Sequence, residues 1–151
     1  MPISIRKIYS NQTIDIRHEA IWPDKKREFC ILEDDKNGTH FGLYKQEELI
    51  SIISLYIRES KARIRKMATK PAYQKKGFGS KLICHSISFL ELKNINYIYL
   101  FSRKKAQMFY EKFGFLSEGD YFKKENISYI KMYKTINAVS YTHLRAHETA
   151  M

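Results

Sequence analysis

The most informative segment of the sequence is RKMATKPAYQKKGFGSKL at residues 65–82. Basic and apolar residues alternate over residues 62–69, which predicts a strand, and Pro71 predicts its end. The hexapeptide that follows, Gln74-Lys75-Lys76-Gly77-Phe78-Gly79, precedes a helical pattern of apolar residues over 80–93. Its two glycines permit positive φ angles, and the free N–H groups at a helix start attract phosphate. The segment therefore predicts a strand, an anion-binding loop and a helix in succession.

The glycine loop differs from the common nucleotide-binding motifs. It lacks the Gly-Lys-Ser/Thr ending of a Walker loop, and it lacks the third glycine of a dinucleotide fingerprint. Taken alone, the loop is equally well explained by a glycine turn in front of a helix.

The rest of the chain adds strands and helices on both sides of this segment. On the N-terminal side the sequence predicts a strand at 4–9, a helix over 11–21 with Asn11 as N-cap, and a hairpin of strands 39–44 and 49–58 joined by residues 45–48. On the C-terminal side it predicts a strand at 97–101 buried on both faces, a helix over 104–113 capped by Gly114, and closing strands at 115–116 and 127–133. The strand, helix and strand over 62–101 form a crossover, which requires part of the sheet to be parallel. We therefore predict a mixed α/β fold with one central sheet of about six or seven strands flanked by helices.

The composition indicates a folded protein with one domain. The chain has 151 residues, of which 44% are hydrophobic and 14% aromatic, too apolar for a disordered chain. Cys30 and Cys84 predict neither a disulfide scaffold nor a zinc cluster, and they fit a reducing compartment. The longest apolar run, residues 49–57, is far short of the roughly 20 residues that a membrane helix needs. Because the N-terminus also lacks an apolar signal core, we expect a cytoplasmic protein without a membrane partner or a metal.

The net charge of +11 comes from 27 Lys and Arg residues against 16 Asp and Glu residues. Such a charge attracts nucleic acid, acidic membranes or polyphosphate ligands. It also follows from a chain rich in Lys, Ile, Asn and Tyr, the residues of AT-rich codons. The basic residues are scattered and no nucleic-acid-binding signature accompanies them, so nucleic acid is not the expected partner.

Residues 138–151 differ in composition from the rest of the chain. They read AVSYTHLRAHETAM and contain no lysine. Because residues 139–149 look like a translated sequencing adapter, we assign the fold to residues 1–137 and treat 138–151 as a non-native tail. The alternative is a genuine short C-terminal helix.

Two motifs in the expected order give the glycine loop a family context. Residues 65–82 resemble the acyl-CoA-binding motif of the GNAT N-acetyltransferase superfamily, in which a strand and a proline turn precede [Gln/Arg]-x-x-Gly-x-[Gly/Ala] at a helix start. Residues 106–115, AQMFYEKFGF, resemble the second family motif, A-x-x-F-Y-x-x-x-G-F. The resemblance covers residues 1 to about 136, and IRHEAIWP at 16–23 further resembles a bacterial subgroup of unassigned substrate.

The resemblance implies a sheet that is splayed at its parallel pair and an acetyl-CoA donor. The pyrophosphate would lie on backbone amides of residues 75–80, and the pantetheine arm would pair with residues 67–69 like an added strand. A backbone N–H near Met67 would polarise the thioester carbonyl. The implied cofactor-binding residues are Met67, Ala68, Thr69, Gln74, Lys75, Lys76, Gly77, Phe78, Gly79 and Ser80.

The resemblance also makes Tyr110 the candidate general acid. A phenol with a pKa near 10 can protonate a departing thiolate within hydrogen-bond reach. Because Tyr110 lies on the apolar stripe of its predicted helix, a core residue with a satisfied hydroxyl is the alternative. The strand at 62–69 has no acidic residue, so the general base stays open and a water-mediated route is one option.

Three residues are candidates for the acceptor site: Arg17, Trp22 and His40. Their alternatives are an exposed cation, a core aromatic and a paired strand histidine. We predict an enzyme, an acetyl-CoA-dependent N-acetyltransferase that acts on a small-molecule or peptide amine as a monomer or homodimer. The alternatives are a non-catalytic acyl-CoA-binding regulatory module and a basic nucleic-acid-binding protein. The charge is also compatible with charged tRNA as the acceptor, and no motif specifies which amine is used.

Overall fold

The computed structural model describes residues 2–136, so the tail assigned to 138–151 lies outside the described residues. The strands are β1 (Ile3–Ile8), β2 (Thr39–Lys45), β3 (Glu48–Arg58), β4 (Lys61–Thr69), β5 (Tyr97–Arg103), β6 (Leu116–Lys124) and β7 (Ile127–Thr135). The α-helices are α1 (Ile14–Ala20), α2 (Phe78–Leu92) and α3 (Gln107–Glu111). Short 3-10 helices are η1 (Ser10–Thr13), η2 (Arg27–Cys30), η3 (Asp35–Asn37), η4 (Pro71–Tyr73) and η5 (Lys104–Ala106). The predicted order of strands and helices is confirmed.

The strands form a seven-stranded mixed sheet in the order β1-β2-β3-β4-β5-β7-β6, with β4 and β5 as the parallel pair. The β1–β2, β2–β3, β5–β7 and β6–β7 pairs are antiparallel. The predicted mixed α/β fold is therefore confirmed, whereas the splay of the parallel pair stays a prediction. By its contacts the chain divides into two compact units, Met1–Ile57 with Arg63–Phe89 and Arg58–Ala62 with Leu90–Met151.

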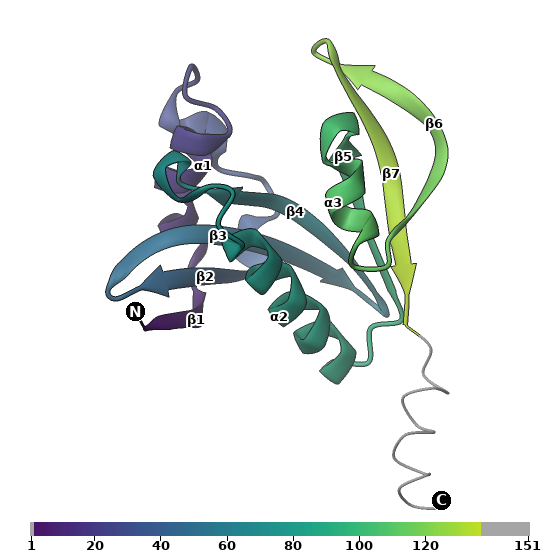
Figure 1. The fold of residues 1–151 in the computed structure, drawn as a ribbon, viewed down its shortest axis with the longest axis horizontal. Helices are drawn as coiled ribbons and strands as arrows, with labels where there is room; N and C mark the ends of the chain where they lie inside the picture. Colours follow the sequence, from purple (N-terminus) through teal and green to yellow (C-terminus); the bar gives the residue numbers. More distant parts are fainter. Residues whose placement is uncertain (1, 137–151) are drawn as a thin grey trace, which may run out of the picture. The chain divides into compact units, whose positions relative to one another are not determined.

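In the first unit, α1 and α2 cover opposite faces of the strands (Figure 1). Ile16 of α1 packs against Ile52 of β3 and Ala68 of β4. Phe41 of β2, whose side chain points the other way, meets Phe89 of α2 edge to face at 5.1 Å between ring centroids. Successive side chains of a strand point to opposite faces of the sheet. A strand covered by a helix on each face therefore needs apolar residues at both odd and even positions. The nearly continuous apolar run of β3 meets this need.

Two local predictions for the first unit are wrong in detail. Asn11 is not the N-cap, because the turn η1 starts at Ser10 and the Tyr9 N–H donates to the Gln12 side-chain oxygen at 2.7 Å. The predicted four-residue connection between β2 and β3 contains only two residues, since Lys45 pairs with Glu48. Gln46 adopts a φ of +59° to close this tighter turn.

In the second unit, β5 is buried on one face only, so the prediction of burial on both faces is wrong. Ile98 and Leu100 are buried, whereas Tyr97 and Tyr99 are half-buried and Phe101 is exposed. The aromatic side chains contact one another, and Tyr97 stacks on Tyr133 of β7 at 5.8 Å between ring centroids. The continuous apolar run at 97–101 therefore has one buried face and one aromatic face that is partly exposed to solvent.

The edge strand β6 is longer than the two residues predicted for it. All of its residues are exposed, so it lacks the buried alternation that marks a strand in sequence. Backbone pairing with β7 holds it, with an irregularity between Glu118 and Phe122 where Gly119 has a φ of +80°. The C-cap of α3 is Lys112, so the prediction of Gly114 as the C-cap is wrong in position. Gly114 closes the turn after the helix with a φ of +89°, and its N–H donates to the Glu111 carbonyl at 3.0 Å. No helix among residues 2–136 is long and apolar enough to cross a membrane.

Candidate functional site

The loop between β4 and α2 is held in a defined shape by side chains of the first unit. Gln74 donates from its amide to the Thr69 carbonyl at 2.9 Å, which ties the loop to the end of β4. Glu48 accepts hydrogen bonds from Lys70 at 3.1 Å and from the Tyr73 hydroxyl at 3.0 Å. These hydrogen bonds hold the η4 turn against Glu48 at the start of β3.

The backbone after Gln74 has an irregular conformation that leaves its amides without acceptors. Lys75 and Gly77 both adopt left-handed conformations, with φ angles of +63° and +89°. The first amide of the helix start to find an acceptor is that of Lys81, which donates to the Gly77 carbonyl at 3.2 Å. Within residues 2–136, the N–H groups of residues 75–80 donate to no acceptor. Such a row of free amides at the positive end of a fifteen-residue helix is a site for an anion.

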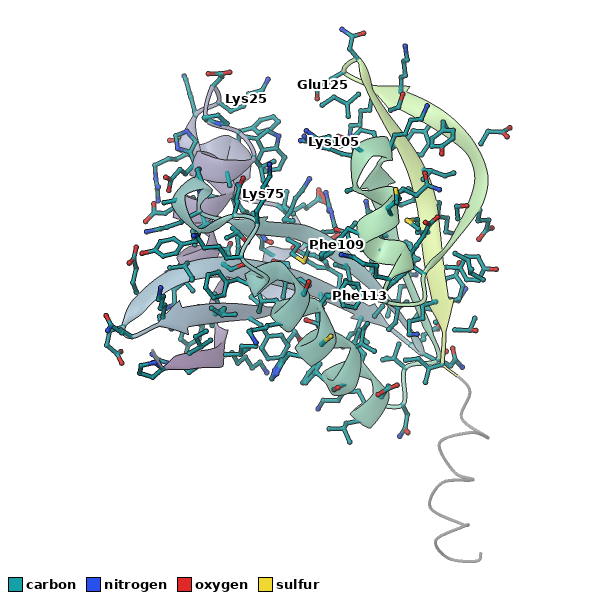
Figure 2. The ribbon with its side chains drawn as sticks, viewed as in Figure 1. Lys25, Lys75, Lys105, Phe109, Phe113 and Glu125 are labelled. Carbon is teal, nitrogen blue, oxygen red and sulfur yellow. The ribbon has the colours of Figure 1, made fainter. Side chains whose placement is uncertain are left out.

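The two glycines of the loop have different roles. A Cβ at Gly77 would meet no atom within 4 Å, so this glycine is required by its φ angle and leaves open space in front of the backbone. Gly79 lies inside α2 and has no positive φ, so the expectation that both glycines use this freedom holds only for Gly77. Lys75 projects from the turn in front of α2 (Figure 2) and adds positive charge there.

The end of β4 supplies the other predicted cofactor-binding residues. Ala68 is buried in the core against α1, so only its backbone is available to a ligand. Met67 and Thr69 are half-buried, and the Thr69 hydroxyl bonds to the Ser51 hydroxyl at 2.7 Å. Residues 67–69 and 74–80 thus both lie in the first unit, joined by the hydrogen bond from Gln74 to Thr69, and their binding of a shared ligand stays a prediction.

A distortion in β4 lies directly before Met67. Lys66 has a φ of +54°, and among the described residues it is the one non-glycine residue inside a strand with a positive φ. The Arg65 guanidinium lies over the Tyr56 ring at 5.9 Å, and the Lys66 ammonium lies over the Trp22 ring at 4.4 Å. Two consecutive side chains of β4 therefore contact aromatic rings at a residue with left-handed backbone. In the sequence this site shows only as adjacent basic residues, and no local signal distinguishes them.

Tyr110 lies in the second unit, on α3. Its ring contacts Phe109 at 5.1 Å and Phe115 at 6.1 Å, both edge to face. Burial raises the pKa of Tyr110 to about 12, so the phenol is neutral at physiological pH. Among the described residues its hydroxyl has no hydrogen-bond partner, and its role as general acid stays a prediction beside the alternative of a packing role. Figure 2 labels Phe109 on α3 and Phe113 in the turn that follows it.

The acceptor-site candidates fall into two environments. Arg17 is fully buried, forms an ion pair with Asp35 at 2.7 Å, and also donates to the Cys30 carbonyl and the Ser54 hydroxyl, both at 2.9 Å. It is therefore no exposed cation, and its guanidinium joins α1 to the loop and to β3. His40 is buried in the same network. Trp22 is half-buried outside it and packs edge to face on Phe29 at 5.0 Å between ring centroids. A role of all three at the acceptor stays a prediction.

Hydrogen bonds around Asp35 and His40 fix their charge states. Burial raises the pKa of the Asp35 carboxyl, but hydrogen bonds from Arg17, the Leu32 N–H and Tyr56 outweigh it, so the net pKa is lowered. Burial lowers the pKa of His40, with the Asp35 backbone acting in the opposite direction. His40 Nε2 donates to the Asp35 carbonyl at 2.9 Å, so Nδ1 accepts from the Ser54 hydroxyl at 2.7 Å. Protonation of Nδ1 would remove its ability to accept the hydrogen bond from Ser54, so the arrangement agrees with a neutral imidazole.

Comparison with known proteins places these features in a family. The family model described as "Acetyltransferase (GNAT) domain" matches residues 6–136. No curated protein matches the sequence. Among solved structures, a putative N-acetyltransferase from Lactobacillus plantarum is similar with a TM-score of 0.79 and 16% identity, over 91% of this chain and 100% of that chain. The ribosomal-protein-S18-alanine N-acetyltransferase from Escherichia coli is similar with a TM-score of 0.76 and 19% identity, over 90% of this chain and 95% of that chain.

A third similar structure has a ligand in its description. It is a GNAT family acetyltransferase from Elizabethkingia anophelis with acetyl-CoA bound, with a TM-score of 0.70 and 18% identity. The match covers 89% of this chain and 98% of that chain. At these identities the three structures establish the fold.

Proposed function

This chain belongs to the acetyltransferase (GNAT) family, and from that premise we propose that it transfers an acetyl group from acetyl-CoA to a primary amine. The family makes the chain an enzyme, an acyl-CoA-dependent acyltransferase of the N-acetyltransferase class. Acetyl-CoA as the particular donor is supported by the Elizabethkingia relative, which binds it. Direct attack of the amine in a ternary complex completes the proposal.

The observation that carries the proposal is the row of free amides in front of α2. Six consecutive residues, 75–80, present N–H groups without an acceptor in the described chain, next to the Lys75 and Lys76 side chains. The space at Gly77 leaves room for a diphosphate against the backbone. These features fit acetyl-CoA, and we assign its pyrophosphate to Gln74, Lys75, Lys76, Gly77, Phe78, Gly79 and Ser80 and its pantetheine arm to the backbone of Met67, Ala68 and Thr69.

Two groups of the chain would serve the chemistry. When bound, acetyl-CoA supplies an acyl carbon activated as a thioester. The Met67 N–H donates a hydrogen bond to the carbonyl oxygen, where negative charge develops during attack. The Tyr110 hydroxyl donates its proton to the departing sulfur, and its pKa of about 12 keeps that proton in place until then. Since β4 contains no acidic residue, the proton lost by the amine passes to water.

Binding and turnover, measured separately, test this proposal. Calorimetry with acetyl-CoA, CoA and a DNA duplex measures binding, and thiol release across a panel of amines measures transfer. We expect micromolar binding of acetyl-CoA, with thiol release that depends on an added amine. Binding without thiol release would instead support a regulatory acyl-CoA-binding module. Salt-dependent DNA binding without acetyl-CoA binding would overturn the proposal.

Tyr110→Phe tests the general acid. Removing the hydroxyl should lower turnover by about 10²-fold and leave acetyl-CoA affinity unchanged, because the ring packing is kept. The matched control is Tyr133→Phe, which removes a hydroxyl from a stacked tyrosine of β7. Steady-state kinetics and calorimetry on both variants make the comparison. Equal turnover of Tyr110→Phe and the control would return Tyr110 to a packing role.

We also propose a cytoplasmic location and a monomeric or homodimeric state. A cytoplasmic location would give it access to intracellular acetyl-CoA, and the monomer or homodimer expected from the sequence is testable by light scattering.

A further inference from the structure

We infer that the acceptor is an amine that also carries an oxyanion group, a carboxylate or a phosphate, and that Arg65 and Lys66 hold this group beside Trp22. The inference rests on the proposed function, because it takes the acyl group to lie at Met67, the residue that follows Lys66. It concerns a set of residues in the first unit, named here the cation–aromatic cluster: Trp22, Phe29, Tyr56, Arg65 and Lys66.

The left-handed backbone of Lys66 in β4 underlies this cluster. A regular strand would send Arg65 and Lys66 to opposite faces of the sheet. The φ of +54° at Lys66 brings both cations onto aromatic rings, with Arg65 at 5.9 Å from the Tyr56 ring centre and Lys66 at 4.4 Å from that of Trp22. A left-handed lysine inside a strand costs conformational energy, and such strain concentrates where ligands bind. Both cations thereby lie within two residues of the predicted acyl site at Met67.

The charge of the cluster is not balanced at Arg65. Arg65 is half-buried, and within residues 2–136 it has no carboxylate partner. The nearby Asp35 carboxylate, which accepts from Tyr56 at 2.7 Å, is already paired with buried Arg17. A planar guanidinium that is partly desolvated and lacks an anion is suited to bidentate binding of a carboxylate or phosphate.

Charge also argues against simple amines as acceptors. An ammonium group that approaches Arg65 and Lys66 is repelled, and the repulsion is strong where solvent is partly excluded. An oxyanion on the same molecule reverses the sign of the net interaction and places the amine on the Met67 side of the cations. The edge-to-face pair of Trp22 and Phe29, 5.0 Å apart, offers an apolar wall for the carbon skeleton between the two groups.

Trp22 provides a readout that needs no turnover, because it is the single tryptophan of the sequence. Fluorescence of the full chain with saturating CoA is titrated with matched pairs of probes. Phenylalanine is compared with phenethylamine, which lacks the carboxylate, and phosphoethanolamine with ethanolamine, which lacks the phosphate. We expect saturable changes with the oxyanion member of at least one pair, and its identity separates carboxylate from phosphate recognition. Equal responses of both members in each pair, or no response to any probe, would overturn the inference.

Variants assign the oxyanion to the two cations. Arg65→Gln and Lys66→Met should each weaken binding of the responding probe at least about tenfold, the usual loss for a charge-assisted hydrogen bond. The matched control is Arg6→Gln, because Arg6 also lies over a tyrosine ring, that of Tyr44 at 4.1 Å, yet belongs to β1. An equal loss in the control would overturn the assignment.

The two proposals fail in different ways. Oxyanion-dependent fluorescence without thiol release would keep the binding inference and count against the transferase. Efficient acetylation of phenethylamine and ethanolamine, with no preference for their oxyanion partners, would keep the transferase and overturn the inference.

Discussion

The buried side chain of Arg17 links several elements of the first unit. It lies on α1, pairs with Asp35 in the loop before β2, and donates to Ser54 of β3. Replacing Arg17 by Met leaves the Asp35 carboxylate buried without its counter-ion, so the free energy of unfolding should fall by about 3–5 kcal/mol. Urea denaturation at pH 7 measures the change.

A double-mutant cycle separates this pairing from the loss of packing. In Arg17→Met/Asp35→Asn no unpaired buried charge remains, so the double variant should be clearly more stable than the sum of the single effects predicts. Strictly additive effects would show that the ion pair is not what couples the two residues.

At the level of elements, the turn between β4 and α2 makes a prediction through its backbone. Gly77→Val forces a β-branched residue to a φ of +89° and fills the space in front of the amides, so acetyl-CoA binding should be lost to calorimetry. Gly119→Val is the matched control: Gly119 has a φ of +80°, open space around it and a place on β6. Comparable affinity in the two variants would disprove the amide site.

Elements could be predicted from the sequence where burial repeats with a period. The helix α2 shows this, because Leu82, Ile83 and Leu90 are fully buried on one side of it. The strand β6 is exposed at every position and is held in the sheet by backbone pairing, so its sequence has no apolar pattern that predicts it. The loop before α2 was predictable because glycine and helix start are both local signals. The Arg17–Asp35 pair was not, because its members are 18 positions apart and no repeat connects them.

At the scale of the whole molecule, the +11 charge and the buried network combine to make stability depend on pH. The folded-state pKa values of His40 and Asp35 are both lowered, so the unfolded chain binds more protons than the folded chain at acidic pH. Each group therefore contributes stability above its unfolded pKa and loses it as pH falls towards its folded pKa. The loss begins below 6.5 for His40, and below 3.8 for Asp35.

We therefore expect the free energy of unfolding to decrease between pH 7 and pH 5, where the charge of His40 is the first of the two to matter. The ring faces Ser54, Tyr56 and the Asp35 carbonyl, and burial is the main cause of its lowered pKa. The Asp35 backbone and carboxylate favour protonation of the ring, and the Arg17 cation opposes it. His40→Gln keeps a donor for the Asp35 carbonyl and cannot be protonated, so its slope over this range should be shallower than that of the wild type. Urea denaturation at half-unit pH steps measures the free energy of unfolding of the wild type and of His40→Gln. The difference between the two profiles removes the effect of the net positive charge, which both chains share. If both profiles have the same slope, the pH dependence arises from the net charge and His40 does not contribute.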